Sequence, residues 1–312
     1  MNTHSMSLAS APVPRAGWLI PALLFFGLWC MSSEIVRAQV DTALVDDNFD
    51  TLVNPGTGLR NSNGQYSTAP KASTWWYVNT TSGTTPLSTS AVAAPAEGNF
   101  SGNAISVNFR ATNNVAISTF AATTLGVGDS LTVSFDYYFA GALTTSNRDP
   151  QFGLFNGTAP TADVANGGTI PTVSSGYQVD LGMGTNASRI NKGFFAPFAG
   201  AETRIGDAVN LSSNFTQGEA NHFSLVITRT AESSVTASFY LDGASTPTLT
   251  GIDTAATNFT FNEFIFRGRS DGEIDNFKVT YTSVIPEASM FGLLAASAGL
   301  VFAMVCRRRS AA

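Results

Sequence analysis

The chain has 312 residues and a net charge of −6 at pH 7, and only 12% of its side chains are charged. Residues 39–285 contain 20 acidic and 11 basic side chains, without the basic patch that binding to nucleic acid requires. The 23 phenylalanines argue against a disordered chain. Cys30 and Cys306 lie in the two terminal apolar segments, so we expect a folded body without a disulfide and without a nucleic-acid partner.

Residues 1–38 have the layout of a secretory signal peptide. Arg15 precedes an apolar run, residues 18–31, that is short for a membrane span. Val36-Arg37-Ala38 then places small side chains at the positions that a signal peptidase reads. We therefore predict export of the protein and cleavage after Ala38.

The body, residues 39–283, shows the patterns of β-strands and no convincing helical period. Residues 103–109 and 130–139 alternate polar and apolar side chains, as half-buried strands do. Residues 222–230 and 234–241 are expected to form a hairpin, with a tight turn at Asp242-Gly243. Further strands are predicted at residues 44–49, 151–155, 177–183, 259–267 and 273–281.

Strands at this spacing predict an all-β, two-sheet antiparallel sandwich of the jelly-roll type. Long polar stretches at residues 62–72, 83–98 and 156–175 are expected to be loops, where ligands commonly bind.

Four segments of the body resemble concanavalin A-like jelly rolls. Asp46-Asp47-Asn48-Phe49-Asp50 and Ile274-Asp275-Asn276-Phe277 resemble the first and last strands of that superfamily. Residues 222–227, followed by residues 238–243, resemble its laminin G-like hairpin. The resemblance implies a concanavalin A-like fold in which the first and last strands are often neighbours.

Three carboxylates alternate near the end of the body. Asp271, Glu273 and Asp275 would face one side of the last strand. The β-glucanases of the superfamily that the body resembles carry alternating carboxylates as nucleophile and acid/base, so a glycoside hydrolase or lyase is one alternative function. The glucanase pattern begins and ends with glutamate and is flanked by aromatic residues. Because this trio departs from that pattern, we expect a protein that is not an enzyme.

Asp275 is also a candidate metal ligand. Its face of the strand continues with Phe277 and Val279, so the carboxylate is expected to point toward the core, where it needs a partner. If the first and last strands are neighbours, Asp46, Asp47 or Asp50 lies near it, and such an all-oxygen ligand set suits Ca²⁺. The alternative is that these carboxylates accept backbone hydrogen bonds. No cofactor is expected to be required.

Trp75-Trp76-Tyr77 is a candidate platform for glycan stacking. Consecutive strand residues face opposite ways, so one tryptophan is expected in the core while the other offers a flat ring to a pyranose. Packing of both rings in the core or at an edge is the alternative. His222 is the only histidine of the body, which argues against a zinc site.

Residues 284–312 have the layout of a membrane-bound tail. Pro286-Glu287-Ala288 precedes an apolar segment, residues 289–306, which Arg307, Arg308 and Arg309 follow. A helix over this segment would be about 27 Å long, close to the thickness of a bilayer's hydrocarbon core. The arginines place its far end in the cytoplasm.

This order of Pro-Glu motif, apolar helix and arginine cluster resembles the PEP-CTERM sorting signal of bacterial exported proteins. The resemblance implies one transmembrane helix, a temporary anchor in the inner membrane, and an exosortase-type processing enzyme that passes the body to the cell envelope or the extracellular space. We expect a structural or adhesive protein of the cell surface or extracellular matrix that contacts polysaccharide. A carbohydrate-binding module with a defined pocket is the second alternative to this function.

Overall fold

The computed structural model describes residues 38–50, 73–79, 91–108, 114–141, 148–158, 175–183, 185–193, 202–268 and 271–285. The predicted signal peptide up to residue 37 and the predicted sorting motif, membrane helix and arginine cluster lie outside these ranges. Within them, no helix is long and apolar enough to cross a bilayer. Residues Gln39–Val284 form one compact unit.

Two strands of this unit show the clearest alternation of buried and partly exposed side chains. In β11 (Ala220–Ala231) and β12 (Ser234–Leu241), nearly every second side chain is buried and its neighbours are partly exposed. The two strands pair as the predicted hairpin. Asp242 and Gly243 both have positive φ, and the Ala244 amide donates to the Leu241 carbonyl at 3.1 Å, which confirms the predicted turn.

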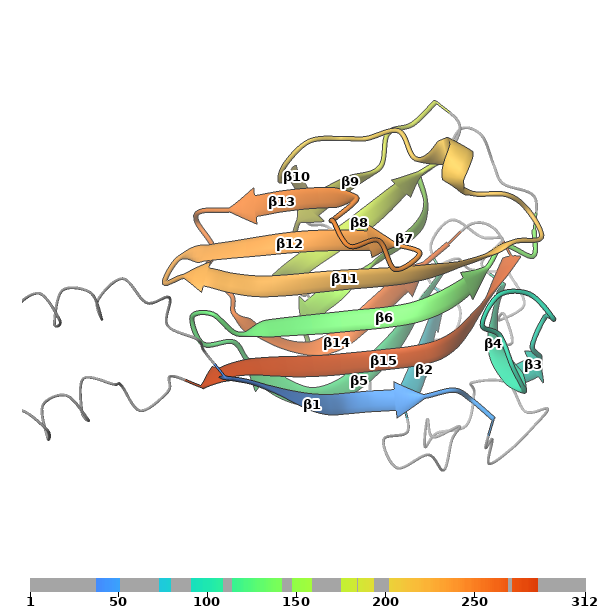
Figure 1. Cartoon of the computed structure of the whole chain (residues 1–312), viewed down its shortest axis with the longest axis horizontal. Helices are drawn as coiled ribbons and strands as arrows, with labels where there is room; N and C mark the ends of the chain where they lie inside the picture. Colours follow the sequence, from blue (N-terminus) through green and yellow to red (C-terminus); the bar gives the residue numbers. More distant parts are fainter. Residues whose placement is uncertain are drawn as a thin grey trace, which may run out of the picture. The chain divides into compact units, whose positions relative to one another are not determined.

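The strands form two antiparallel sheets that face each other (Figure 1). The eight-stranded sheet has the order β13-β12-β11-β6-β15-β4-β3, with β1 also paired to β15. Besides β11 and β12 it contains β1 (Ala38–Asp47), β3 (Ala91–Ala93), β4 (Asn103–Asn108), β6 (Ser130–Tyr138), β13 (Leu249–Asp253) and β15 (Asp271–Ile285).

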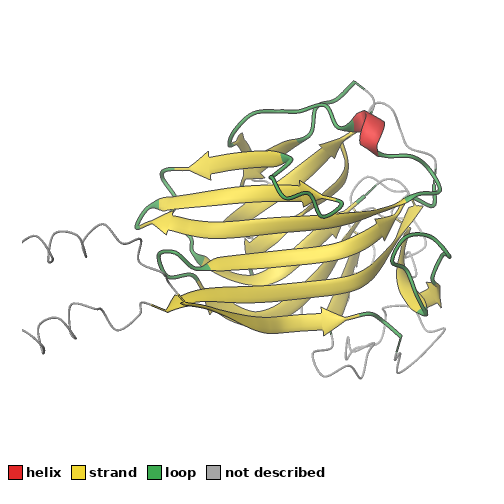
Figure 2. Cartoon of the chain, in the orientation of Figure 1, coloured by secondary structure: helices red, strands yellow, loops and turns green. Residues whose placement is uncertain are grey.

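The seven-stranded sheet has the order β10-β9-β8-β7-β14-β5-β2. It contains β2 (Thr74–Asn79), β5 (Asn114–Thr124), β7 (Arg148–Asn156), β8 (Ser175–Gly182), β9 (Arg189–Lys192), β10 (Thr203–Arg204) and β14 (Thr260–Arg267). In the described ranges, the helical element is the 3₁₀ turn η2 (Ser212–Asn214), as Figure 2 shows. The predicted all-β sandwich of two antiparallel sheets is confirmed, and so is the pairing of the first strand with the last.

Phenylalanine rings fill the space between the sheets. Phe135 of β6 is fully buried, and its ring centroid lies 5.1 Å from that of Phe152 in β7. The same ring lies 5.6 Å from Phe223 of β11 and 5.5 Å from Phe264 of β14. The tilted and edge-to-face arrangements are those that the ring quadrupole favours. Both sheets therefore contribute to one aromatic core.

Several strands were not predicted, because their polar and apolar residues do not alternate clearly or because they are short. In β5, residues 115–118 are all buried, so the strand has no polar face that would mark its period. β3 lies inside the stretch expected to be a loop, and β9 and β10 have four and two residues. β1 begins at Ala38, six residues before the predicted strand.

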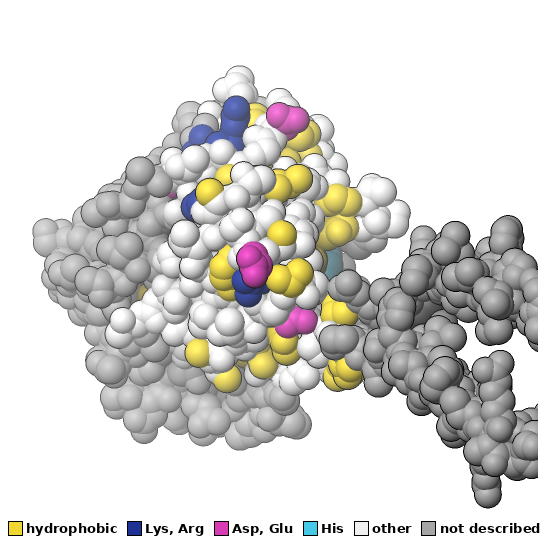
Figure 3. Space-filling model, turned by 90° about the vertical axis from the view of Figure 1, so that its left-hand side faces the viewer, with side chains coloured by type: hydrophobic (Ala, Val, Ile, Leu, Met, Phe, Trp, Pro, Cys, Tyr) yellow, Lys and Arg dark blue, Asp and Glu magenta, His cyan; other side chains and the backbone are white. Residues whose placement is uncertain are grey.

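Charged side chains are sparse on the surface. Figure 3 shows one end of the molecule, where a few acidic and basic groups lie among mostly uncharged atoms. This distribution agrees with the low charge content of the sequence.

Replacement of Phe135 tests the role of the aromatic core. We expect Phe135→Ala to lower the free energy of unfolding by about 3–5 kcal/mol, because it leaves a cavity at the contact of four rings. Ser134→Ala, at the neighbouring outward position, should change it by less than about 0.5 kcal/mol. Urea unfolding of both variants measures the difference, and equal effects would contradict the assigned core.

Candidate functional site

Trp75, one member of the predicted glycan platform, is a core residue. Its side chain is fully buried, and its ring centroid lies 4.9 Å from that of Phe277. Its indole nitrogen donates to the Ser73 hydroxyl at 2.8 Å. Because a buried ring offers no face to a sugar, Trp75 is the tryptophan that was expected in the core and is not part of a glycan platform. The side chains of Trp76 and Tyr77 lie outside the described part of the structure.

Asp46 and Asp47, two predicted calcium ligands, face opposite ways. Asp47 is buried, and its Oδ2 accepts hydrogen bonds from the amide and hydroxyl of Ser73 at 2.8 and 2.6 Å. Its Oδ1 accepts a bond from the Phe49 amide at 3.0 Å. Asp46 is exposed, with its Oδ2 3.3 Å from Nζ of Lys278. Asp47 therefore ties β1 to the start of β2, while Asp46 forms a surface ion pair.

Asp275, the third predicted ligand, lies on the outer side of its sheet and not on the core side as predicted. It pairs in register with Asp136, which alternates with the core residues Phe135 and Tyr137 of β6. A β-bulge follows at Asn276, which has φ +52. Because of this extra residue, the Phe277 side chain points toward the core. The bulge reverses the phase of the strand, and the sequence pattern does not reveal it.

Backbone donors occupy the Asp275 carboxylate. Its Oδ1 accepts a hydrogen bond from the Asn276 amide at 2.7 Å, and its Oδ2 accepts one from the Ser101 amide at 3.2 Å. In the described ranges, no three His, Cys, Asp or Glu side chains are grouped so that they could hold a metal ion. Asp46, Asp47 and Asp275 therefore do not form the predicted ligand set. Calcium binding itself, and the absence of a required cofactor, stay predictions.

Among the acidic trio, the described side chains of Glu273 and Asp275 do not form an open carboxyl pair. The Asp271 side chain lies outside the described residues, and Asp275 is fully buried. Glu273 Oε2 is buried without a partner, and burial raises the pKa of this carboxyl. A retaining glycosidase needs two carboxyls that both reach the substrate. The geometry at Glu273 and Asp275 gives no support to the hydrolase alternative.

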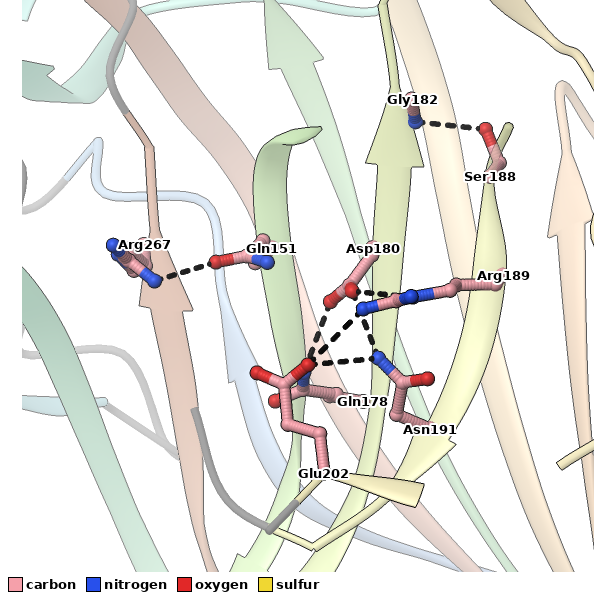
Figure 4. Close-up of polar contacts among 9 residues, drawn as sticks. All are labelled: Gln151, Gln178, Asp180, Gly182, Ser188, Arg189, Asn191, Glu202 and Arg267. Carbon is pink, nitrogen blue, oxygen red and sulfur yellow. Dashed lines mark hydrogen bonds and ion pairs between the residues drawn. The ribbon is translucent and has the colours of Figure 1, made fainter. Parts of the chain in front are cut away.

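A different set of polar side chains lies on the outer face of β8 and β9, the polar face (Figure 4). In β8, Tyr177 and Val179 point into the core, so Gln178 and Asp180 point to the opposite side. Register pairing places Asn191 of β9 beside Gln178 and places Arg189 beside Asp180. The four side chains therefore form two adjacent rows on one face.

Asp180 is the hub of this polar face. Its side chain is fully buried and accepts a hydrogen bond from Gln178 Nε2 at 2.9 Å. Its Oδ2 accepts bonds from Arg189 Nε at 3.0 Å and from Asn191 Nδ2 at 2.8 Å. The buried charge is thus balanced by a guanidinium and by two amide donors, as a buried carboxylate requires.

The polar face runs from a buried floor to a rim that solvent reaches. Glu202, just before β10, accepts hydrogen bonds from Arg189 Nη2 at 3.2 Å and from Asn191 Nδ2 at 3.3 Å. The Arg189 and Glu202 side chains are 22% and 16% exposed, whereas Asp180 is 0% exposed. A ligand approaching this rim meets both signs of charge.

Two acceptors on the polar face have no donor. Gln178 Oε1 and Asn191 Oδ1 are buried, and neither has a hydrogen-bond partner. An unpaired buried acceptor costs about 1–3 kcal/mol, so native proteins seldom leave one without a reason. Two of them on register-paired residues mark a place where an added donor would stabilise the protein.

The polar face continues onto the neighbouring strands. Gln151 of β7 pairs in register with Arg267 of β14, and the Arg267 guanidinium donates to Gln151 Oε1 at 2.8 Å. At the other side, the Gly182 amide donates to the Ser188 hydroxyl at 2.9 Å. Polar side chains therefore lie on four adjacent strands of the sheet, as Figure 4 shows.

Sequence reasoning predicted the strand at 177–183 but did not single out the residues of the polar face. Gln178 and Asp180 alternate with apolar residues, and that alternation is the signal that could have found them. Arg189 and Asn191 follow the same alternation around Ile190, but four residues are too few to reveal a strand. Their proximity to Asp180 depends on the register of β8 and β9.

No family model matches the chain, and no curated protein matches it. A structure of a protein of unknown function from Shewanella oneidensis MR-1 is 12% identical, with a TM-score of 0.41, over 91% of this chain and 99% of that chain. An endo-1,3-β-glucanase from Streptomyces sioyaensis is 12% identical, with a TM-score of 0.41, over 88% and 100%. Peanut lectin is 10% identical, with a TM-score of 0.40, over 80% and 99%.

Titration of Asp275 tests its placement. Burial raises the pKa of this carboxyl from 3.8 to about 6, and the nearby Asp50 and Asp136 carboxylates add to the rise. The folded protein therefore binds the Asp275 proton more tightly than the unfolded chain does. The resulting stabilisation is fully present below the pKa of the unfolded state, and it is lost as the pH rises through the pKa of the folded state. Asp275→Asn removes this titration. Between about pH 4 and pH 7, we expect the wild-type protein to lose up to about 3 kcal/mol of unfolding free energy relative to the variant.

Urea unfolding across this pH range measures the effect. Asp46→Asn is the matched control, because Asp46 is exposed and should leave the pH profile of the wild type unchanged. Parallel profiles for the wild type and Asp275→Asn would mean that Asp275 is not buried as described.

Proposed function

We propose that the protein is an exported, non-enzymatic component of the cell surface or extracellular matrix, and that its β-sandwich contacts polysaccharide through the polar face of β8 and β9. The observation that carries the proposal is the pair of buried amide oxygens, Gln178 Oε1 and Asn191 Oδ1, that lack donors. The concanavalin A-like resemblance of the sequence motifs supports the same class of ligand.

A carbohydrate can pair with both the hydrogen-bond acceptors and the hydrogen-bond donors of this face. Each sugar hydroxyl can donate one hydrogen bond and accept others. Gln178 Oε1 and Asn191 Oδ1 need donors, and the Arg189 guanidinium, 22% exposed at the rim, carries N–H groups that a hydroxyl can accept from. A polyol on this face would first contact Arg189 and Glu202 at the rim, and it would reach the two buried amide oxygens only after the side chains that cover them move.

The charges favour a neutral ligand. Asp180 and Glu202 place two carboxylates around one guanidinium, so an anionic ligand would meet repulsion at short range. The body as a whole carries 20 acidic and 11 basic side chains, which opposes anions at longer range. Neutral polysaccharide is therefore preferred over an acidic one.

The same contacts argue for binding without hydrolysis. Both oxygens of Asp180 accept bonds from the side chains around it, and Glu202 Oε2 accepts bonds from Arg189 and Asn191. A glycosidase needs one carboxyl held protonated as the acid and a second one placed to attack the sugar or activate water. Here both carboxylates are engaged in ion pairs with Arg189.

Export rests on the terminal sequences. We propose that residues 1–38 direct secretion and that residues 284–312 hold the body in the inner membrane until an exosortase-type enzyme removes the tail. Pro286 and Glu287 would be the motif that this enzyme reads, and Arg307, Arg308 and Arg309 would keep the end of the chain in the cytoplasm.

Glycan binding of the full-length chain tests the polar face. We expect binding to neutral glycans on a glycan array, and a loss of at least about tenfold in affinity for Gln178→Met, which at similar volume removes both the unpaired oxygen and the Nε2 donor to Asp180. Gln217→Met is the matched control, because Gln217 is exposed next to β11 in the other sheet. Unchanged binding by folded Gln178→Met would contradict the proposal, and so would a full-length chain that binds no glycan.

Cell fractionation tests the sorting tail. We expect the wild-type product to leave the inner membrane without its tail, whereas a variant with both Pro286→Ala and Glu287→Ala should remain there at full length. Glu232→Gln, in the turn between β11 and β12, should behave as the wild type does. A full-length wild-type product found in the cytosol would overturn the export proposal while leaving the glycan proposal untouched.

A further inference from the structure

A polar cavity of about 370 Å³ lies on the eight-stranded sheet, away from the polar face. It is lined by residues 220–222 at the start of β11, by Asp136 of β6, by the turn at residues 242–243, and by residues 98–99 between β3 and β4. Cavities of this size hold small organic ligands. All of these residues are described, and none belongs to the polar face of β8 and β9.

One side of the cavity is a charged row across two strands. His222 and Asp136 pair in register, and His222 Nδ1 lies 2.6 Å from Asp136 Oδ1. The hydrogen bond to Asp136 raises the pKa of His222, and burial opposes this rise. The Asp136 carboxylate therefore favours the charged form of the imidazole at this side of the cavity.

A second carboxylate is fixed at the opposite side by the turn. Asp242 Oδ1 accepts a hydrogen bond from the His222 amide at 2.9 Å, and its Oδ2 accepts one from Asn221 Nδ2 at 3.1 Å. Asp242 has φ +53, a backbone conformation that Asp and Asn adopt more readily than most residues do. The turn thus aims this carboxylate at the start of β11.

Residues 98–99, which form the remaining wall, are held in place by the bulge in β15. Asn276 Nδ2 donates to Asp136 Oδ2 at 2.8 Å and to the Asn99 carbonyl at 3.1 Å. Gly98 has φ +61, and a Cβ there would lie 3.1 Å from Cβ of Ala220. The segment before β4 therefore packs closely on β11, and the cavity is formed before any ligand binds.

One lining residue, Asn221, carries an amide oxygen without a donor. Asn221 lines the cavity and is 8% exposed, and its Oδ1 is buried without a hydrogen-bond partner. Its Nδ2 is already engaged with Asp242, which fixes the side-chain amide with its oxygen unpaired.

We propose that this cavity binds a protonated primary amine. An ammonium group has three N–H donors and no acceptor. The cavity offers the carboxylates of Asp136 and Asp242, which only accept hydrogen bonds. The lining has two carboxylates, Asp136 and Asp242, and one imidazole, His222, so it favours a cation even when His222 is protonated. The proposal is independent of glycan binding at the polar face, because the two sites lie on different sheets.

Two sources share this chemistry, and calorimetric titration of the full-length chain distinguishes them. Glucosamine carries the ammonium on a sugar, butylamine carries it on an alkyl chain, and N-acetylglucosamine has the sugar with the charge removed. We expect glucosamine to bind and N-acetylglucosamine not to bind at this cavity. Comparable binding of butylamine would show that the ammonium alone is recognised, and weaker butylamine binding would identify an amino sugar. Failure of both amines to bind would overturn the proposal.

Two variants with opposite expected effects separate recognition from structural damage. Asp242→Asn keeps the backbone conformation and removes one negative charge, so the affinity for the amine should fall by about tenfold. His222→Gln removes the competing positive charge and should increase the affinity. Glu232→Gln, at the other end of β11, is the matched control and should leave it unchanged.

A thermal melt of each variant confirms folding. A folded Asp242→Asn protein that binds as tightly as the wild type contradicts the proposal, and so does a folded His222→Gln protein that binds more weakly.

Discussion

The packing of aromatic rings between the two sheets is the constraint on which the structure depends. No disulfide is expected in the body, so the strands are held together by burial of rings such as Phe135, Phe152 and Phe223. Each core strand must turn one face to these rings, which leaves the alternate side chains on the outside. The polar groups of both proposed sites occupy such alternate positions: Asp180 beside Val179, and Asp136 beside Phe135.

Carboxylates on the two outer faces are balanced by different partners. On the seven-stranded sheet, Arg189 balances Asp180, and the unmet requirement is for donors to neutral amide oxygens. On the eight-stranded sheet, His222 balances Asp136, while Asp242 adds a second carboxylate beside an unpaired amide oxygen. The first arrangement suits hydroxyl groups and the second suits a cation. Distinct ligands on distinct sheets would suit a protein that joins components of an extracellular matrix.

Strands with one polar and one apolar face could be predicted from the sequence. The alternation at residues 130–139 and 222–241 predicted β6, β11 and β12, because burial of one face imposes period two. β5 could not be predicted, because residues 115–118 are buried on both faces. The direction of Asp275 depends on the bulge at Asn276, which sequence alternation does not display. The polar face depends on the pairing of β9 with β8, a contact that no local pattern encodes.

A crystal structure of the protein with a bound neutral oligosaccharide tests the central claim most directly. The account predicts sugar hydroxyls within hydrogen-bonding distance of Gln178 Oε1 and Asn191 Oδ1, with Arg189 donating to the same sugar. A sugar bound at another surface, with these two oxygens still without a sugar donor, would contradict it.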